Sequence, residues 1–99
     1  MSYAVRYTQQ AKDDIERLFD FWLDQDTATA ERAILTIEQA MHLLKTFALS
    51  CRKAEPSNPF LRELIIPFGA NGYVAMFEIE DKETVTILSI RHQREDDFH

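Results

Sequence analysis

The chain of 99 residues has few of the residues that interrupt regular structure and almost none that could crosslink it. It contains two glycines, three prolines and one cysteine. Because apolar residues make up 45% of the chain, this composition is typical of a packed globule with no low-complexity segment. The single cysteine, Cys51, cannot close an intrachain disulfide, and no metal-ligand spacing surrounds it. We therefore expect a fold without disulfides, bound metal or cofactor.

Long apolar runs are also missing. The longest uninterrupted runs are a few residues, far short of the roughly 20 residues that a membrane-spanning helix needs. The first six residues, MSYAVR, lack the apolar segment of a signal peptide. These two absences predict a cytoplasmic protein with no membrane partner.

Positive charge is in short supply, and it is concentrated in two places. The net charge is −6, which argues against generic coating of nucleic acid, since phosphate binding depends on Lys and Arg. Residues 45–62 nevertheless hold Lys45, Arg52, Lys53 and Arg62 against Glu55 alone. Arg91 and Arg94 form the second group, near the C-terminus. Because local fields decide what a surface attracts, these cations are the candidate binding groups.

Apolar spacing predicts a short strand at residues 3–7 followed by two helices. Thr8 can cap the first helix, in which apolar residues recur at helical spacing from Ala11 to Leu23. The segment Asp24-Gln25-Asp26-Thr27 interrupts the pattern and offers capping side chains for a second helix, whose apolar positions continue to Phe47 or Ala48. Since the connection is so short, the helices should form an antiparallel hairpin.

The second half of the chain predicts strands. Residues 49–59 read as irregular, because they contain Ser50, Pro56, Ser57, Asn58 and Pro59. Strands are expected at residues 60–66, 73–80 and 84–92. Pro67 should end the first of these three strands. Short turns join the three into an antiparallel meander, to which the first strand returns and whose one face the hairpin covers. The prediction is one α+β domain over residues 1–99, with the order β-α-α-β-β-β.

The last predicted strand ends in a cluster of polar side chains, Arg91-His92-Gln93-Arg94. Strict alternation puts Val85, Ile87, Ser89 and Arg91 on one face, so Arg91 should lie at the rim of the face that Ile87 lines. Arg62 falls between Phe60 and Leu64 on its own strand, where an unpaired guanidinium is costly. Arg62 should therefore have a partner, such as the carboxylate of Glu63 or Glu78, or an exposed concave surface.

Three further groups have possible chemistry beside an ordinary role. His92 could act as a general base, since imidazole is the side chain best suited to that role, although a histidine at a strand end more often makes or caps hydrogen bonds. Arg52 and Lys53 could lower the pKa of Cys51, but no base lies beside that thiol. The pair Asp13-Asp14 is expected on the solvated surface of the first helix.

Five segments, in this order along the chain, resemble the RelE/ParE superfamily of type II toxins, and in particular its ParE-like branch. They are Thr8 to Ile15 after the first strand, Ser50-Cys51-Arg52-Lys53 after the hairpin, Phe60-Leu61-Arg62-Glu63-Leu64, Gly72 to Phe77, and Ile90-Arg91-His92-Gln93-Arg94-Glu95. The resemblance covers essentially the whole chain. It implies the toxin of a toxin–antitoxin pair, held inactive in a hetero-oligomer by a small antitoxin, ParD-like or similar.

The resemblance also implies one of two targets. ParE-like toxins poison DNA gyrase, whereas RelE-like toxins enter the ribosome and cleave mRNA. Carried over by position, the nuclease groups would be Arg52, Arg62, Arg91 and His92, and Phe98 stands where a catalytic tyrosine could. Phe98 has no hydroxyl, and the acidic run Glu95-Asp96-Asp97 would repel RNA, although His99 remains unassigned.

The expected function is therefore a toxin that inhibits DNA gyrase and is not an enzyme. An mRNA endonuclease and an inert antitoxin-binding domain are the alternatives. The residues expected to bind the target or the antitoxin are Arg52, Lys53, Arg62, Arg91, His92 and Arg94.

Overall fold

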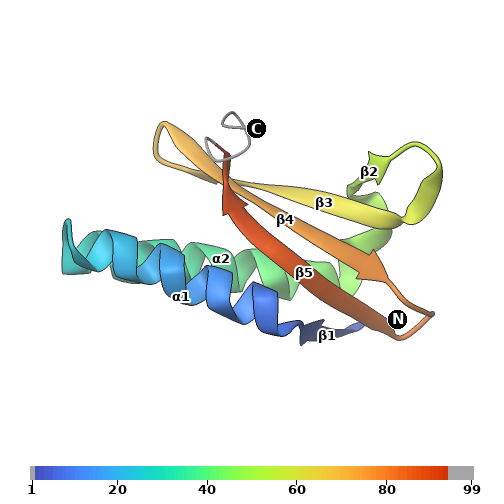
Figure 1. The fold of residues 1–99 in the computed structure, drawn as a ribbon. Helices are drawn as coiled ribbons and strands as arrows, with labels where there is room; N and C mark the ends of the chain where they lie inside the picture. Colours follow the sequence, from blue (N-terminus) through green and yellow to red (C-terminus); the bar gives the residue numbers. More distant parts are fainter. Residues whose placement is uncertain (1, 94–99) are drawn as a thin grey trace.

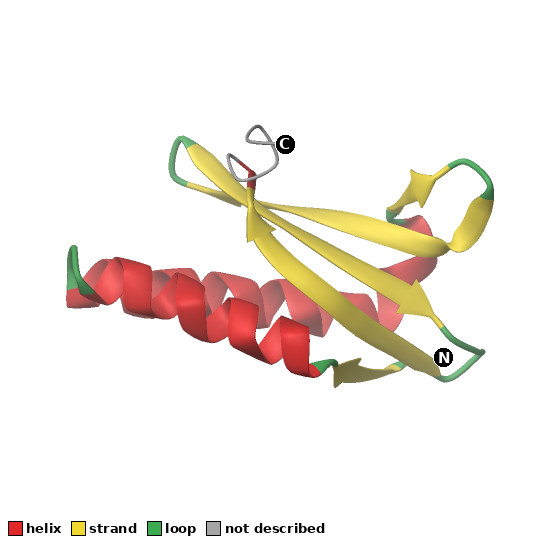
Figure 2. Ribbon diagram, viewed as in Figure 1, coloured by secondary structure: helices red, strands yellow, loops and turns green. Residues whose placement is uncertain are grey.

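The computed structural model describes residues 2–93, in which two helices lie against one face of a five-stranded sheet (Figures 1 and 2). The elements are β1 (Ala4–Tyr7), α1 (Gln9–Leu23), α2 (Thr27–Phe47), the short 3-10 helix η1 (Ala48–Ser50), β2 (Arg52–Glu55), β3 (Asn58–Phe68), β4 (Asn71–Ile79) and β5 (Thr84–His92). The predicted α+β class and the helical hairpin are confirmed.

Both helices begin at the predicted capping residues. The Thr8 hydroxyl accepts a hydrogen bond from the backbone N–H of Ala11, and the Asp26 carboxylate accepts one from Thr29. Each bond satisfies one of the amides that a helix start leaves without an intrahelical partner. The short link between Leu23 and Thr27 then sets the two helices side by side, as Figure 1 shows.

The sheet has the strand order β1-β5-β4-β3-β2. Strands β3, β4 and β5 form the predicted antiparallel meander, and β1 returns to the edge of β5 in parallel orientation. The turn between β3 and β4 contains Gly69 at φ 62, a conformation that favours glycine. A side chain at Gly72 would collide with the carbonyl of Ile66, so this turn depends on both glycines.

Two expectations for the middle of the chain are wrong. Residues 52–55, expected to be irregular, form the edge strand β2, which pairs with the beginning of β3. Strand β3 also passes through Pro67 and ends at Phe68, two residues beyond the expected end. Proline is tolerated in a strand where its nitrogen faces away from the hydrogen-bonded neighbour, and the sheet edge offers such a position.

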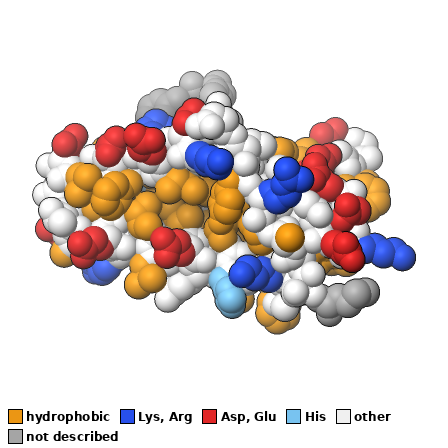
Figure 3. All heavy atoms as spheres, turned by 90° about the horizontal axis from the view of Figure 1, so that it is seen from below, with side chains coloured by type: hydrophobic (Ala, Val, Ile, Leu, Met, Phe, Trp, Pro, Cys, Tyr) orange, Lys and Arg blue, Asp and Glu red, His pale blue; other side chains and the backbone are white. Residues whose placement is uncertain are grey.

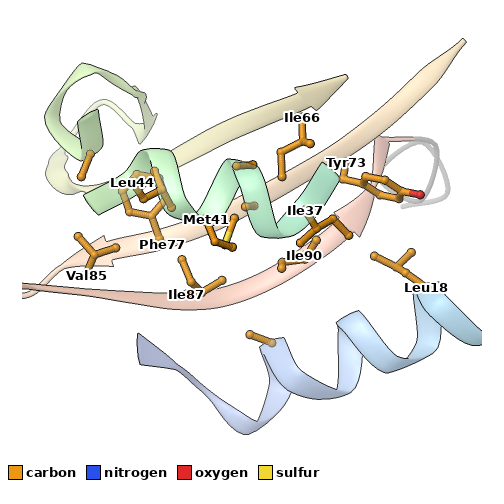
Figure 4. Packing of buried hydrophobic residues seen from close by; sticks show 14 of the residues in the cluster. Leu18, Ile37, Met41, Leu44, Ile66, Tyr73, Phe77, Val85, Ile87 and Ile90 are labelled. Carbon is orange, nitrogen blue, oxygen red and sulfur yellow. The ribbon is translucent and has the colours of Figure 1, made fainter. Parts of the chain in front are cut away.

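The core lies between the sheet and the hairpin (Figure 4). Strands β4 and β5 contribute Tyr73, Phe77, Val85, Ile87 and Ile90, and helix α2 contributes Ile37, Met41 and Leu44. Trp22 packs at the margin of this core, partly exposed, and its indole N–H donates to the Tyr73 hydroxyl at 2.7 Å. Within residues 2–93, neither helix has the length and apolar content needed to cross a bilayer.

Candidate functional site

The polar end of β5 does not follow strict alternation, because the strand contains a β-bulge. Met76 of β4 pairs with Ser89, but the next residue, Phe77, pairs with Ile87, so Leu88 has no direct partner. Val85 and Ile87 are buried before the bulge and Ile90 after it. The prediction that Arg91 shares a face with Ile87 is therefore wrong. A bulge inserts one residue and reverses the alternation beyond it.

The start of α1 holds this bulge in place. The Thr8 hydroxyl lies 3.1 Å from the carbonyl oxygens of both Ile87 and Leu88, and the Thr8 N–H donates to Ile87 at 3.0 Å. Beyond the bulge, the Ile90 N–H donates to the Asp14 carboxylate at 3.0 Å. Asp14 is 3% exposed, so its predicted place on the solvated surface is wrong. The Asp14 carboxylate also accepts a hydrogen bond from the Gln10 side chain and forms an ion pair with Arg17. Its role is therefore structural.

The bulge and the strand register bring Arg91 and Arg52 to the same side of the sheet, away from the helices. In the strand register, Arg52 of β2 lies opposite Glu63 of β3, and Glu63 lies opposite Met76 of β4. Arg91 of β5 lies opposite Val74 of β4, and Val74 lies opposite Ile65 of β3. Directly paired residues point to the same face of a sheet. We call the surface formed by Arg52, Glu63, Ile65, Val74, Met76 and Arg91 the open sheet face.

The two arginines of the open sheet face differ in their contacts. The Arg52 Nε donates to the Glu63 carboxylate at 2.8 Å, although the Arg52 side chain is 61% exposed. Arg91 is exposed on β5, and no ion pair or hydrogen bond links its side chain to another of residues 2–93. Arg91 is thus the more available cation.

Arg62 lies on the helix side of β3 and has a structural role. Its guanidinium donates to three backbone carbonyls, those of Pro59 at 2.6 Å, Cys51 at 2.8 Å and Leu49 at 3.1 Å. The expectation that Arg62 has a partner is confirmed, but the partners are carbonyl oxygens and not a carboxylate. Because these bonds engage Nε and Nη1 and leave only Nη2, Arg62 is a poor candidate for contact with a substrate.

The Cys51 thiol is less acidic than the neighbouring cations suggested. Burial raises its pKa, and the opposing effect of Arg62 is smaller. The expectation of a lowered pKa is therefore wrong, and the reason is desolvation of the thiolate. Cys51 is half-buried, and its sulfur lies 3.7 Å from the Phe47 carbonyl oxygen.

His92 faces the helix side of the sheet and joins an aromatic cluster. Its ring lies 5.8 Å from that of Tyr73 in an edge-to-face arrangement, and Tyr73 also contacts Phe68. Burial raises the pKa of the Tyr73 hydroxyl, against the smaller opposing effect of the hydrogen bond from Trp22. His92 is therefore on the opposite face from Arg91, and the structure does not bring the two together.

The remaining predicted site residues are dispersed. Lys53 is exposed on β2, directly opposite Arg62. Arg94, the acidic run at 95–97, Phe98 and His99 lie outside the described residues. Within residues 2–93, no three potential metal ligands are grouped closely enough to hold an ion.

The structure also contains a hollow that the sequence analysis did not predict. It has a volume of about 410 Å³ and lies between the end of α2 and the outer edge of β3. Its lining residues are Leu43, Leu44, Phe47, Ser50, Cys51, Arg52, Glu63, Leu64 and Ile65, and we call it the β3-edge hollow. Leu43 and Phe47 are 51% and 55% exposed. Their i, i+4 spacing beside the buried stripe of α2 is the sequence signal for this second apolar surface.

A larger hollow of about 650 Å³ lies at the other end of β3. The exposed side chains of Leu49 and Phe60 line it together with Glu78, Glu80 and Asp81. Figure 3 shows the helical side of the molecule, where apolar side chains lie between charged ones. Apolar surface therefore remains exposed beside the helices, in addition to the cationic residues of the sheet.

Comparison with known proteins identifies the chain. The model of a family described as the ParE toxin of type II toxin–antitoxin systems matches residues 5–97. A protein named toxin RelE3, from Caulobacter vibrioides, is 32% identical over 93 residues, which are 93% of this chain and 96% of that protein.

A solved structure supports the fold. A chain of the chromosomal ParDE system from P. aeruginosa is similar with a TM-score of 0.74 and 20% identity, over 92% of this chain and 96% of that one. With a family match over nearly the whole sequence and the same fold, the chain belongs to the ParE toxin family and is the toxin of a type II pair, which implies a cognate antitoxin as its partner.

Proposed function

We propose that this toxin inhibits DNA gyrase and does not hydrolyse nucleic acid. The observation that carries the proposal is that the candidate nuclease side chains make separate structural contacts and lie on different faces of the sheet. Arg62 is bound to three backbone carbonyls and Arg52 to Glu63, while His92 packs on Tyr73 on the opposite face from Arg91. A ribonuclease needs several cations and a proton-transferring group around one phosphodiester. These four side chains do not converge in that way.

Ribosome-dependent cleavage of mRNA is the second candidate. It is favoured by the exposed Arg91 on the open sheet face and by the name of the relative, toxin RelE3. Under this alternative, Arg52 and Arg91 would contact the RNA backbone together. An inert domain that only binds the antitoxin is the third possibility.

Two assays on the purified chain separate these functions. The first measures supercoiling by purified gyrase, and the second measures cleavage of mRNA on programmed ribosomes. We expect loss of supercoiling and intact mRNA, and growth arrest with DNA-damage signalling when the toxin is expressed without its antitoxin. Cleaved mRNA with unaffected gyrase would overturn the proposal. Normal growth at high levels of folded protein would favour the inert domain.

A substitution on the open sheet face tests whether this face contributes to the inhibition of gyrase. Arg91→Gln removes the available cation from an exposed position, so the fold should be retained and the inhibition of gyrase weakened several-fold or more. Arg32→Gln is the matched control, because Arg32 is an exposed arginine on α2, on the helix side. Equal inhibition by both variants would show that Arg91 does not contribute.

A further inference from the structure

The larger hollow lies beside the turn that joins β4 to β5, next to the start of the chain (Figure 1). Its volume is about 650 Å³. Four separate parts of the chain line it, which are Tyr3, Leu49 of η1, Asn58 and Phe60 of β3, and residues 78–82. The proposed function uses none of these residues. We call this site the acidic hollow.

The apolar walls of the acidic hollow are exposed to water. Leu49 and Phe60 are 60% and 56% exposed, more than any other large apolar side chain of residues 2–93. Exposure of large apolar side chains is unfavourable, and where they gather on a surface they mark an interaction site. Two such side chains in one hollow therefore indicate a surface that a partner covers.

Polar contacts hold these two residues in place. The Arg62 guanidinium donates to the carbonyl of Leu49 at 3.1 Å and to that of Pro59, next to Phe60, at 2.6 Å. The Phe60 N–H donates to the Asn58 side chain at 3.0 Å. The backbone that carries both apolar walls is thus fixed before any partner binds. A preorganised surface loses less entropy on binding, which favours affinity.

Carboxylates lie around the apolar walls. Glu78, Glu80 and Asp81 line the hollow, and Lys82 is the one cation among its lining residues. The Asp81 carboxylate accepts a hydrogen bond from the Glu83 N–H at 2.8 Å, which fixes the turn. No ion pair or hydrogen bond links the side chain of Glu78 or Glu80 to another of residues 2–93. These two carboxylates are therefore available to a cationic partner.

The apolar walls and the free carboxylates together determine the chemistry of the partner. Phosphate groups would be repelled, so a nucleic acid does not suit this site. A protein segment with a large apolar side chain beside a lysine or arginine suits it, because the cation can bond to the carboxylates. An enzyme that acts on DNA has basic segments, since contact with the phosphate backbone depends on lysine and arginine. DNA gyrase, the target proposed above, is such an enzyme.

We propose that the acidic hollow binds a basic segment of DNA gyrase. A large apolar side chain of that segment packs against Leu49 and Phe60, and a neighbouring lysine or arginine bonds to Glu78 or Glu80. This inference rests on the proposed function and adds to it a surface by which the toxin holds its target. The hollow lies at the other end of β5 from Arg91, so the two can be tested separately.

Binding of purified gyrase to substituted toxins tests the proposal. Phe60→Ser reduces one apolar wall at an exposed position. Leu35→Ser is its control, because Leu35 is 53% exposed on α2 but outside the hollow. Glu80→Gln removes a free charge with little change in shape, and Glu31→Gln, at an exposed position of α2 outside the hollow, is the matched control. Circular dichroism confirms that each variant folds.

We expect Phe60→Ser to raise the Kd for gyrase about tenfold or more, as for central interface residues, and to weaken the inhibition of supercoiling in parallel. Glu80→Gln should raise the Kd about threefold at low salt. This difference should shrink as the salt concentration rises, because salt screens exposed charges. Leu35→Ser and Glu31→Gln should bind within about twofold of the unchanged chain.

The outcomes separate this inference from the proposed function. If the unchanged chain inhibits gyrase and Phe60→Ser binds as tightly as Leu35→Ser, only this inference is overturned. If the unchanged chain neither binds nor inhibits gyrase, the proposed function fails and this inference fails with it. Weaker binding of the antitoxin, or loss of self-association, in Phe60→Ser with unaltered binding of gyrase would assign the hollow to another occupant and overturn the proposal.

The charge substitution decides the matter if Phe60→Ser does not fold. Glu80 lies at an exposed position, so its replacement by glutamine should leave the fold intact. Affinities of Glu80→Gln and Glu31→Gln that are equal at low salt would then overturn the proposal.

Discussion

The guanidinium of Arg62 joins three parts of the chain that are adjacent in space. It bonds to carbonyls at Leu49 in η1, at Cys51 before β2 and at Pro59 in β3. A guanidinium suits this position because its planar donors point in several directions at once. Lysine has one compact cation and could not reach all three carbonyls together.

Replacement of Arg62 should therefore destabilise the fold. Arg62→Ala leaves these carbonyls without their donor, and a hydrogen bond to a charged group contributes about 1.5–3 kcal/mol. We expect a loss of about 2 kcal/mol or more in the free energy of unfolding, measured with urea. Arg52→Ala breaks only an exposed ion pair and should cost under about 1 kcal/mol. Equal losses would contradict the structural role of Arg62.

The thiol of Cys51 should react slowly with iodoacetamide at neutral pH. Burial raises its pKa above the usual 9.0, so the reactive thiolate is scarce. The alkylation rate should stay below that of a free-cysteine peptide and rise as the pH passes 9.0. The thiol of the unfolded chain loses its proton at a lower pH than the thiol of the folded chain. The raised pKa therefore does not lower the free energy of unfolding below pH 9.0, and it lowers it increasingly as the pH rises above that value. Rapid alkylation at pH 7 would indicate a lowered pKa instead.

At the scale of elements, the contact between α1 and β5 determines where the end of the sheet points. Thr8 bonds to the carbonyls of Ile87 and Leu88, and Asp14 accepts from Ile90, so one helix holds both sides of the bulge. The bulge in turn directs Arg91 to the open sheet face and His92 toward Tyr73. The positions of these two candidate site residues therefore depend on a helix far away in the sequence.

Loss of the Asp14 carboxylate should loosen this contact. Asp14→Ala leaves the buried Ile90 N–H without an acceptor, which costs about 1–3 kcal/mol. The neighbouring Asp13→Ala is the control, since Asp13 is exposed and should change the stability by no more than about 0.5 kcal/mol. Urea unfolding measures both, and exchange of the Ile90 amide should accelerate only in Asp14→Ala. Unchanged exchange there would show that another group holds the bulge.

At the scale of the whole molecule, one core joins both layers, so the chain should unfold as a single unit. Helix α2 and strands β4 and β5 contribute to the same buried cluster (Figure 4). Domains of this size with one core usually unfold in one cooperative transition. Thermal unfolding followed by circular dichroism and by Trp22 fluorescence should give coincident curves. Two separated transitions would contradict a single core.

The antitoxin should stabilise the whole fold by binding its native state. With free antitoxin at a hundred times its Kd, the free energy of unfolding rises by about 2.7 kcal/mol. The gain is measured by urea unfolding and should increase with the concentration of antitoxin. A free energy of unfolding that does not change with the antitoxin concentration would contradict binding to the native state.

The order and type of most elements could be predicted because local rules govern them. Thr8 and Asp26 cap the helices, apolar spacing marks the buried stripes, and Gly69 and Gly72 mark a turn. Strand β2 could not be predicted, because its four residues have little apolar pattern and become a strand only through pairing with β3.

The sequence by itself determined the α+β class, the hairpin, the meander and the family, since spacing, capping residues and motif order are properties of neighbouring residues. Only the tertiary structure decided which candidate groups share a surface. The bulge at Leu88 reversed the faces on which Arg91 and His92 lie. Arg62 bonds to backbone carbonyls that include that of Leu49, 13 residues earlier in the chain. Strand β2 ends its pairing at Glu63, so the outer edge of β3 is exposed beyond that residue. Each of these depends on contacts between elements, and such contacts have no local signature.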